Sequence, residues 1–338
     1  MKKGKKLVAS VVIPIYNAEK NIVETLDALN HQTVDNFEVV LVDDGSKDDS
    51  LKIIREYKSK FKKKVISQEN SGPAAARNLG AKSSDSEIII FLDSDCVPYE
   101  NFVEEMIKPF EDKEIVGVHG QYETKNKNSF IARYIGYEMA YRQEPMKKAE
   151  RIDHMATHAA AYRKKDFGEG FSTGFRHADM EDIEFSYRLA KEGKKMVFRS
   201  SAKIKHPHPE KFSKFVKQQF GRGYWRVLGH IKHPEKIVKD SYMGNSIAVQ
   251  GLLSVLFFIL TLIYIFSIML FGFLKFLYLP LIGIVIIYLS NIPLGIYCFK
   301  YEKNMLILAP AMAVIRSISA TLGFLLGMVN FVLLKRDK

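Results

Sequence analysis

Short apolar runs alternate with amphipathic stretches over the first part of the chain. The run "LVASVVIPIYN" at 7–17 predicts a buried strand, and in the next stretch apolar residues recur at helical spacing, at Ile22, Val23, Leu26 and Leu29. The alternation continues as strand, helix, strand, helix and strand at 37–46, 49–61, 64–70, 71–84 and 87–95. Repeated β-α units of this kind predict an α/β fold with a mostly parallel sheet and helices on both faces.

Long uncharged runs replace this alternation from about residue 246 onward. Three apolar segments, at 246–271, 274–299 and 305–334, reach the roughly 20 residues that a helix needs to cross a bilayer. The third carries Arg316, which is costly in lipid unless it is paired, so this segment either crosses or re-enters the membrane. Lysines are frequent ahead of residue 246, and the positive-inside rule then predicts a multi-pass protein of the cell membrane with a cytoplasmic N-terminal region.

The stretch between these two regions has apolar and aromatic residues at helical spacing, with lysines between them. Residues 210–233 therefore predict a basic amphipathic helix that lies in the membrane interface, or else packs against a protein core. This pattern divides the chain into a domain at 1–208, an interfacial helical linker at 209–240 and an α-helical membrane region at 241–338.

Charge and cysteine content narrow the class of protein. The net charge of +12 suits a protein that lies against anionic lipid headgroups or handles phosphates. Nucleic acid is not an expected partner, because the chain has a membrane region and lacks a zinc-finger or RNP-type pattern. Cys96 and Cys298 form no disulfide framework and fit a reducing cytoplasm. The basic start superficially resembles a secretory signal, but Pro14 interrupts its short apolar run, so we expect an uncleaved first strand.

Polar residues cluster where the predicted strands end. They are Tyr16 and Asn17 after the first strand, Asp43 and Asp44 after the second, and Asp93 and Asp95 after the fourth. Ligands bind at the carboxyl ends of the strands in such sheets, so one site is expected from several loops. No strand is followed by a G-x-G-x-x-G turn, which argues against a dinucleotide oxidoreductase.

The segment "IIIFLDSD" ends an apolar run on two aspartates. Side chains alternate along an extended chain, so Asp93 and Asp95 are expected to point the same way and to repel unless a cation lies between them. A divalent cation with oxygen ligands is the natural partner. The alternative for this segment alone is a solvated turn closed by Pro98.

Five segments in order resemble the family 2 inverting glycosyltransferases of the GT-A fold. They are "VVIPIYNAEKNI", "VVLVDDGSKDDS", "ENSGPAAARNLG", "IIIFLDSDCVP" and "ADMEDIEFSYRLAKEG". The resemblance covers roughly the first two thirds of the chain and implies a nucleotide-sugar-binding domain with a Rossmann-like, mixed but mostly parallel sheet. Membrane-tailed members of the family likewise append helices after the catalytic domain.

The resemblance also implies roles for individual residues. For the nucleotide, usually uridine, it implies Pro14, Tyr16, Asn17, Asp43 or Asp44, Arg77 and Asp93. The alternative for the two acids of the second loop is a turn with Gly45, and for Arg77 it is a surface salt bridge. The segment at 155–167 resembles the small-residue stretch that lines the donor sugar.

Metal and catalytic residues follow from the same resemblance. Asp93 and Asp95 would hold Mg²⁺ or Mn²⁺ against the diphosphate, and His206 is either a third ligand or a loop residue. In "ADMEDIEF", Asp182 is our choice for the general base, with Glu181 and Asp179 close enough to be confused with it. Acids at this place also suit a helix N-terminus for structural reasons alone.

The amphipathic stretch contains a partial match to a second motif. Gln219, Arg222 and Trp225 resemble the Q-x-x-R-W element of membrane polysaccharide synthases, where they would lie near the acceptor or the diphosphate. Gly223 stands where that element has tryptophan, which puts processive synthesis in doubt.

These features together predict a membrane-anchored, metal-dependent hexosyltransferase. It would transfer a sugar with inversion from a nucleotide sugar, usually a UDP-sugar, to a lipid phosphate or a lipid-linked glycan. The alternatives are a processive polysaccharide synthase and a non-catalytic membrane scaffold on the GT-A fold. A nucleotidyltransferase would show a glycine-rich phosphate loop near the N-terminus, and "IPIYNAEKN" is not one.

Overall fold

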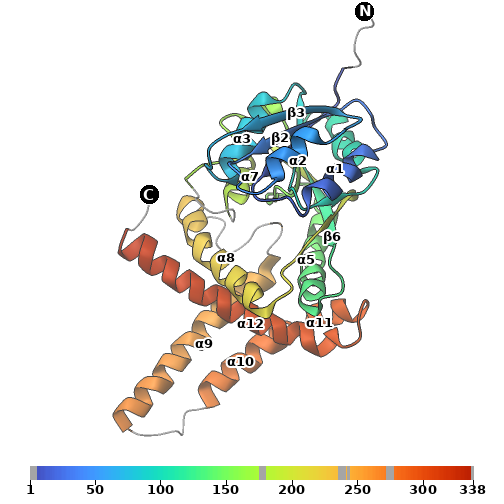
Figure 1. Ribbon diagram of the computed structural model, residues 1–338. Coiled ribbons are helices and arrows are strands. Elements are labelled where there is room, and N and C mark those ends of the chain that lie inside the picture. Colours follow the sequence, from blue (N-terminus) through green and yellow to red (C-terminus); the bar gives the residue numbers. More distant parts are fainter. Residues whose placement is uncertain (1–5, 175–179, 235–240, 242–243, 272–277, 336–338) are drawn as a thin grey trace, which may run out of the picture. The chain divides into compact units, whose positions relative to one another are not determined.

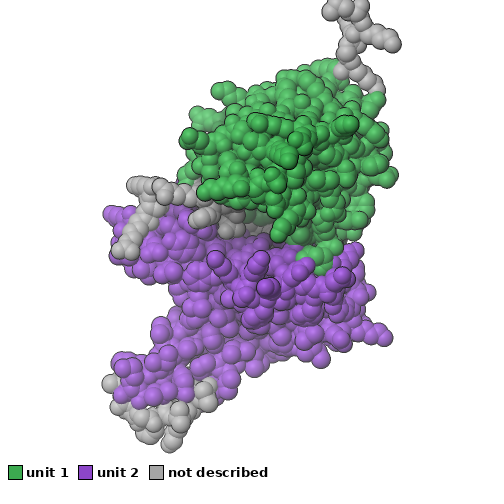
Figure 2. Space-filling model, viewed as in Figure 1, with its two compact units in different colours: residues 1–126, 143–207 green, residues 127–142, 208–338 purple. Residues whose placement is uncertain are grey.

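The computed structural model describes residues 6–174, 180–234, 241, 244–271 and 278–335 (Figure 1). The chain forms two compact units, coloured separately in Figure 2. The first unit contains residues 1–126 and 143–207, and the second contains residues 127–142 and 208–338. Helix α5 (Phe130–Lys148) contributes residues to both units.

The first unit is built on an eight-stranded sheet with the order β3-β2-β1-β4-β7-β6-β8-β5. The strands are β1 (Ser10–Ile15), β2 (Glu38–Asp43), β3 (Lys62–Ser67), β4 (Ile88–Leu92), β5 (Val97–Pro98), β6 (Ile115–Thr124), β7 (Ala159–Arg163) and β8 (Lys195–His206). Strands β1 to β4 pair in parallel, as do β6 and β8, whereas β7 runs antiparallel to both of its neighbours and β5 runs antiparallel to β8. The predicted α/β class with a mostly parallel sheet is confirmed.

The predicted alternation corresponds to the first four strands and the helices between them. The helices of this unit are α1 (Ile22–Asn30), α2 (Ser50–Glu56), α3 (Pro73–Ser83), α4 (Phe102–Ile107), the 3₁₀ turn η1 (Lys108–Glu111), α6 (Lys164–Phe167) and α7 (Glu181–Lys191). In β1, successive residues Val11, Val12 and Ile13 are all fully buried. Neighbouring side chains of a strand point to opposite faces, so both faces of the sheet are covered here.

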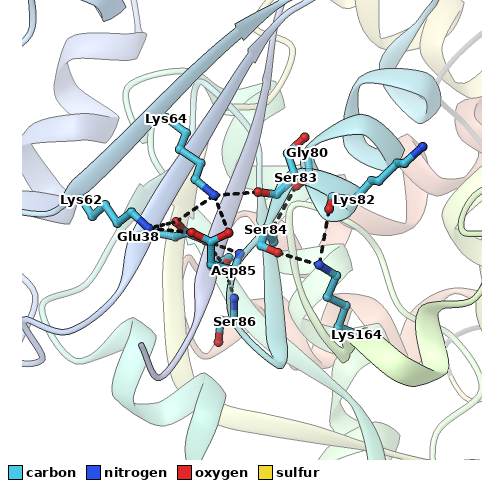
Figure 3. A network of polar contacts seen from close by, with 11 residues as sticks. Glu38, Lys62, Lys64, Gly80, Lys82, Ser83, Ser84, Asp85, Ser86 and Lys164 are labelled. Carbon is cyan, nitrogen blue, oxygen red and sulfur yellow. Dashed lines mark hydrogen bonds and ion pairs between the residues drawn. The ribbon is translucent and has the colours of Figure 1, made fainter. Parts of the chain in front are cut away.

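A polar network lies at the amino-terminal edge of the sheet, opposite the edge where β1, β2 and β4 end (Figure 3). The fully buried Glu38 accepts hydrogen bonds from the Ser10 hydroxyl (2.7 Å) and the Asp85 backbone N–H (2.6 Å). Lys62 and Lys64 each pair with both Glu38 and Asp85. A buried carboxylate is tolerated only with such partners, so this network is structural and leaves the opposite edge for chemistry.

The second unit is helical. Besides residues 130–142 of α5, it contains α8 (Phe212–Lys232), α9 (Gly244–Phe271), α10 (Tyr278–Ser290), α11 (Ile292–Phe299), α12 (Met305–Gly327) and the π-helical turn η4 (Met328–Leu333). Two helical segments, Leu252–Met269 and Met305–Leu333, are long and apolar enough to cross a membrane. Helices α10 and α11 form a third candidate if this pair, bent by 42°, makes one span.

Helix α8 packs along α12, as Figure 1 shows. A Cβ atom added to Gly223 would lie 1.9 Å from the Ala320 carbonyl oxygen, and one added to Gly323 would lie 2.0 Å from the Phe220 carbonyl oxygen. Only glycine permits such a close approach of two backbones. One face of the predicted interfacial helix is therefore a packing face. Two other residues of the same helix, Phe212 and Ile231, are about half exposed (50% and 53%).

Candidate active site

Three potential metal ligands meet at the carboxyl edge of the sheet. Leu92 and Ala159 are partners in the antiparallel pairing of β4 and β7, so the residues just beyond them, Asp93 and His158, are neighbours across that edge. Strand β8 brings His206 to the same edge, because it runs parallel to β6, which runs antiparallel to β7. The ligand atoms of Asp93, His158 and His206 all lie within 4.8 Å of one another.

This donor set fits a divalent metal ion. It combines one carboxylate with two imidazoles, all three of them half-buried. The rings are held in place by their neighbours: the Tyr122 ring centroid lies 4.5 Å from that of His158 and 5.9 Å from that of His206. The structure thus brings together Asp93 and His206, which the sequence predicted, and adds His158, which it did not.

Asp95 lies outside this three-residue set. Strand β4 ends at Leu92, and the Cys96 N–H closes a turn by donating to the Asp93 carbonyl oxygen at 3.1 Å. The expectation that the two aspartates point the same way assumed an extended chain, and that assumption is wrong for this segment. Burial raises the pKa of Asp95, and repulsion from Asp93 raises it further, while His206 lowers it.

Arg77 of α3 links Asp93, at the carboxyl edge of the sheet, to the start of α7. Its side chain is buried, donating to Asp93 Oδ1 at 2.8 Å and to Glu181 Oε1 at 2.9 Å. Arg77 is therefore not a surface salt bridge. A guanidinium with two carboxylate partners holds both acids in fixed positions, as its planar fork geometry allows.

Two neighbouring acids begin α7 and differ in their surroundings. Glu181 is buried, and this burial, together with the charge of Asp182, raises the pKa of Glu181 to about 7, although Arg77 opposes the shift. Asp182 Oδ2 accepts hydrogen bonds from the Thr157 N–H (3.0 Å) and the Thr157 hydroxyl (3.3 Å). Asp182 is thus held against the residue that precedes His158. Asp179, the third candidate base, lies outside the described residues.

The two aspartates at the end of β2 also differ. Asp44 accepts hydrogen bonds from the Gln68 side chain (2.6 Å) and from the backbone N–H groups of Ser71 and Gly72 (2.9 Å each). Through these bonds, Asp44 holds the loop that leads into α3. Asp43 is also buried, yet its Oδ1 atom has no hydrogen-bond partner among the described residues. A buried carboxylate oxygen without a partner is costly, and a ligand hydroxyl or N–H would satisfy it.

The loop after β1 presents the remaining predicted nucleotide residues. Asn17 has a positive φ of 51°, and its side chain accepts a hydrogen bond from the Lys47 N–H at 2.8 Å. This bond ties the first loop to the second. Tyr16 is exposed (49%), whereas Pro14 is half-buried within β1. Tyr16 is therefore the aromatic side chain of this loop whose exposed ring could stack on a nucleobase.

The partial Q-x-x-R-W residues belong to the second unit. Gln219 and Trp225 lie on α8, where Trp225 packs against Tyr224 and Phe331 at ring-centroid distances of 5.0 and 5.7 Å. The departure at Gly223 has a physical cause, because α12 crosses there and excludes any side chain. A role for Gln219, Arg222 and Trp225 toward acceptor or diphosphate stays a prediction.

His158 and Thr157 are the residues that sequence reasoning missed. The signal was present in "THAAAYR", a histidine directly before a short run of small and apolar residues. The run forms β7, and all three alanines are fully buried. An alanine-rich run has low β propensity, so the pattern predicted no strand and gave no reason to place the preceding histidine at the sheet edge.

Comparison with known proteins identifies the domain. Residues 10–171 match the model of glycosyl transferase family 2. An uncharacterized glycosyltransferase of Rickettsia bellii is 36% identical over 114 residues, which cover 34% of this chain and 16% of that protein. Glycosyltransferase AglE of Haloferax volcanii is 27% identical over 227 residues, covering 64% of this chain and 73% of that protein. The chain spans only 16–20% of the length of the three Rickettsia relatives that it matches.

Solved structures show the same fold. The mannosyltransferase PcManGT of Pyrobaculum calidifontis, in complex with GDP-Man and Mn²⁺, aligns with a TM-score of 0.59 at 16% identity, covering 98% of this chain and 89% of that chain. S. aureus TarS 1–349 in complex with UDP-GlcNAc aligns with a TM-score of 0.52 at 18% identity, covering 96% and 92%. The first unit thus has the GT-A fold. Residues 10–171 thus match a family 2 glycosyltransferase domain, as the sequence motifs predicted.

Proposed function

We propose that this protein is a membrane-anchored, metal-dependent inverting glycosyltransferase that uses a nucleotide-sugar donor. The observation that carries the proposal is the meeting of Asp93 and His206 at the edge of the sheet, with Arg77 linking Asp93 to Glu181, the first residue of α7. A divalent ion bound there would neutralise the charge that develops on the diphosphate leaving group.

The protein's own residues supply the remaining steps. Asp182, oriented by Thr157, takes the proton of the acceptor hydroxyl as its oxygen attacks the anomeric carbon. The bond between this carbon and the diphosphate breaks on the face opposite to the attacking oxygen. The diphosphate leaves, and the configuration of the anomeric carbon is inverted. Asp43 Oδ1 accepts a hydrogen bond from the nucleotide, and the exposed Tyr16 offers its ring to the base.

The donor and acceptor are inferred from chemistry and likeness. Among the structural neighbours, one is described with GDP-Man and another with UDP-GlcNAc, and we favour a uridine diphosphate sugar. A lipid phosphate or lipid-linked glycan is the proposed acceptor, because candidate membrane helices on the same chain would hold the domain at high local concentration of lipid headgroups. The cytoplasmic face of the cell membrane is the proposed location.

The test is a donor panel on the full chain in lipid nanodiscs. UDP- and GDP-sugars are incubated with and without Mg²⁺ or Mn²⁺ and with or without a polyprenyl phosphate, and nucleotide release is measured. We expect release that requires the metal and is faster with the lipid phosphate. Absence of metal-dependent release with every donor would favour the scaffold alternative, and products of many sugar units would favour a processive synthase.

Asp182→Asn tests the base. The variant should bind nucleotide like the wild type but transfer sugar about 10²–10⁴-fold more slowly, because the acceptor proton has lost its recipient. Asp112→Asn is the matched control, since Asp112 is an exposed residue before β6 that pairs with Lys195. Near-normal turnover by Asp182→Asn would refute the assignment.

A further inference from the structure

We propose that His158 is a direct ligand of the metal ion, and that the site therefore selects Mn²⁺ or a similar transition-metal ion over Mg²⁺. This inference deepens the proposed function, on which it rests for the reason that an ion is bound at all. It assigns the role of metal ligand to a residue that the sequence motifs did not indicate, and it predicts which ion the protein prefers.

The position of His158 is fixed by strand pairing. In the register of β4 and β7, five residue pairs follow one another from Ile88 with Arg163 to Leu92 with Ala159. His158 and Asp93 come next on each chain, so their separation is set by the sheet and not by a mobile loop. All three potential ligand atoms of the set lie within 4.8 Å of one another, so small side-chain movements would bring them onto one ion.

Aromatic contacts hold the two imidazoles beside each other. The ring centroids of His158 and His206 are 5.1 Å apart at an interplanar angle of 64°. Tyr122 meets His158 edge to face at 4.5 Å, and His119 meets it at 5.9 Å. Two rings packed in this way keep their orientation, so the site does not depend on ordering flexible side chains when the ion arrives.

The chemistry of the donors decides the ion. Mg²⁺ is a hard cation that prefers oxygen ligands and keeps several waters, whereas imidazole nitrogen suits transition-metal ions. One carboxylate with two imidazoles therefore favours Mn²⁺, Co²⁺ or Zn²⁺. A second carboxylate would shift the balance toward Mg²⁺. Asp95 is near enough for its charge to interact with Asp93 and His206, but it is not one of the three residues whose ligand atoms all lie within 4.8 Å of one another.

The first experiment needs no variant. The purified full chain in nanodiscs is titrated with MnCl₂, with and without UDP, and free Mn²⁺ is followed by electron paramagnetic resonance, with MgCl₂ as competitor. We expect Mn²⁺ to bind at least about tenfold more tightly than Mg²⁺. Pulsed measurements on the bound Mn²⁺ should show nitrogen couplings from two imidazoles. Equal affinities, couplings from one imidazole, or no binding in either condition would overturn the proposal.

Variants separate the ligand from its surroundings. His158→Gln should weaken Mn²⁺ binding by about 10–100-fold with little effect on Mg²⁺, and should leave one nitrogen coupling. His158→Asp replaces the imidazole with a charged oxygen donor and should move the preference toward Mg²⁺. His31→Gln is the matched control, because His31 is an exposed residue at the end of α1 that contacts the Asp27 carbonyl oxygen. Wild-type metal binding by His158→Gln would refute the assignment.

The two proposals fail separately. Metal binding is measured without turnover, so a protein that hydrolyses or transfers no sugar can still show two imidazole couplings, which would sink the glycosyltransferase proposal alone. Conversely, metal-dependent transfer with a single imidazole coupling would retain the enzyme and remove His158 from its metal site.

Discussion

Glu181 is a buried acid whose protonation should change within the ordinary pH range. It is buried beside Asp182, with Arg77 as its cationic partner, and its pKa is raised to about 7. Below that pH the carboxyl holds its proton. Above it, the ionised group adds a negative charge beside the place where the acceptor proton is to be taken up, which favours that proton transfer.

We therefore expect the rate of sugar transfer to rise as the pH passes through about 7. Glu181→Gln cannot ionise and should lose this rise, whereas Glu184→Gln, on the same helix but paired with Arg188, should keep it. The measurement is the initial rate of nucleotide release from about pH 6 to pH 8 for the three proteins. The same inflection in Glu181→Gln would show that another group is responsible.

Residue type alone could predict some of these roles and not others. Asp93 and His206 follow recognisable strands and could be placed at the edge from sequence. Asp43 and Asp44 could not be separated, because the difference lies in three hydrogen bonds from a loop more than twenty residues away. His158 could not be found at all without the register of β7 against β4.

At the scale of elements, the contact between α8 and α12 depends on glycines, which have no side chain to keep the two backbones apart. Gly223 is buried against the Ala320 backbone, and a Cβ atom there would meet the carbonyl oxygen at 1.9 Å. Gly221 is only half-buried on the same helix. The amphipathic pattern predicted α8 within two residues at its start, but the identity of its partner depends on tertiary packing that no local pattern contains.

Gly223→Ala and Gly221→Ala should have opposite effects. Both exchanges favour the helix by up to about 1 kcal/mol. In Gly223→Ala the added methyl group must push the two helices apart, so we expect a net loss of about 1–3 kcal/mol, while Gly221→Ala should be neutral or stabilising. Unfolding of both variants in detergent micelles is followed by circular dichroism. Equal stability of the two would mean that the close approach does not exist in solution.

At the scale of the whole chain, the second unit draws on a segment far away in sequence. Residues 127–142 belong to it, and they include Glu138, which is buried and pairs with both Arg142 and Arg316. The sequence indicated that an arginine in the last apolar segment needs a partner. It could not indicate which one, because Glu138 lies in a stretch that the pattern assigned to the first domain.

Substitution of Glu138 and substitution of Arg316 should lower the free energy of unfolding by different amounts. Glu138→Gln leaves Arg316 buried without a carboxylate, and we expect a loss of about 3–5 kcal/mol. Arg316→Met should cost less, because Glu138 keeps Arg142 as a partner. The double variant should recover much of the loss. Thermal unfolding of the full chain in nanodiscs provides the comparison, and a Glu138→Gln protein as stable as the wild type would contradict the pairing.

The reversed strand β7 has a consequence for how such proteins diverge. Because β7 is antiparallel to β4, one potential metal ligand at this sheet edge follows the end of β4 and another precedes the start of β7. A single-nucleotide change converts a histidine codon into one for aspartate or asparagine, and such a change at position 158 leaves the pairing of both strands as it was. Under the proposed role of His158, the ion that the site prefers is then a trait that a single mutation can alter.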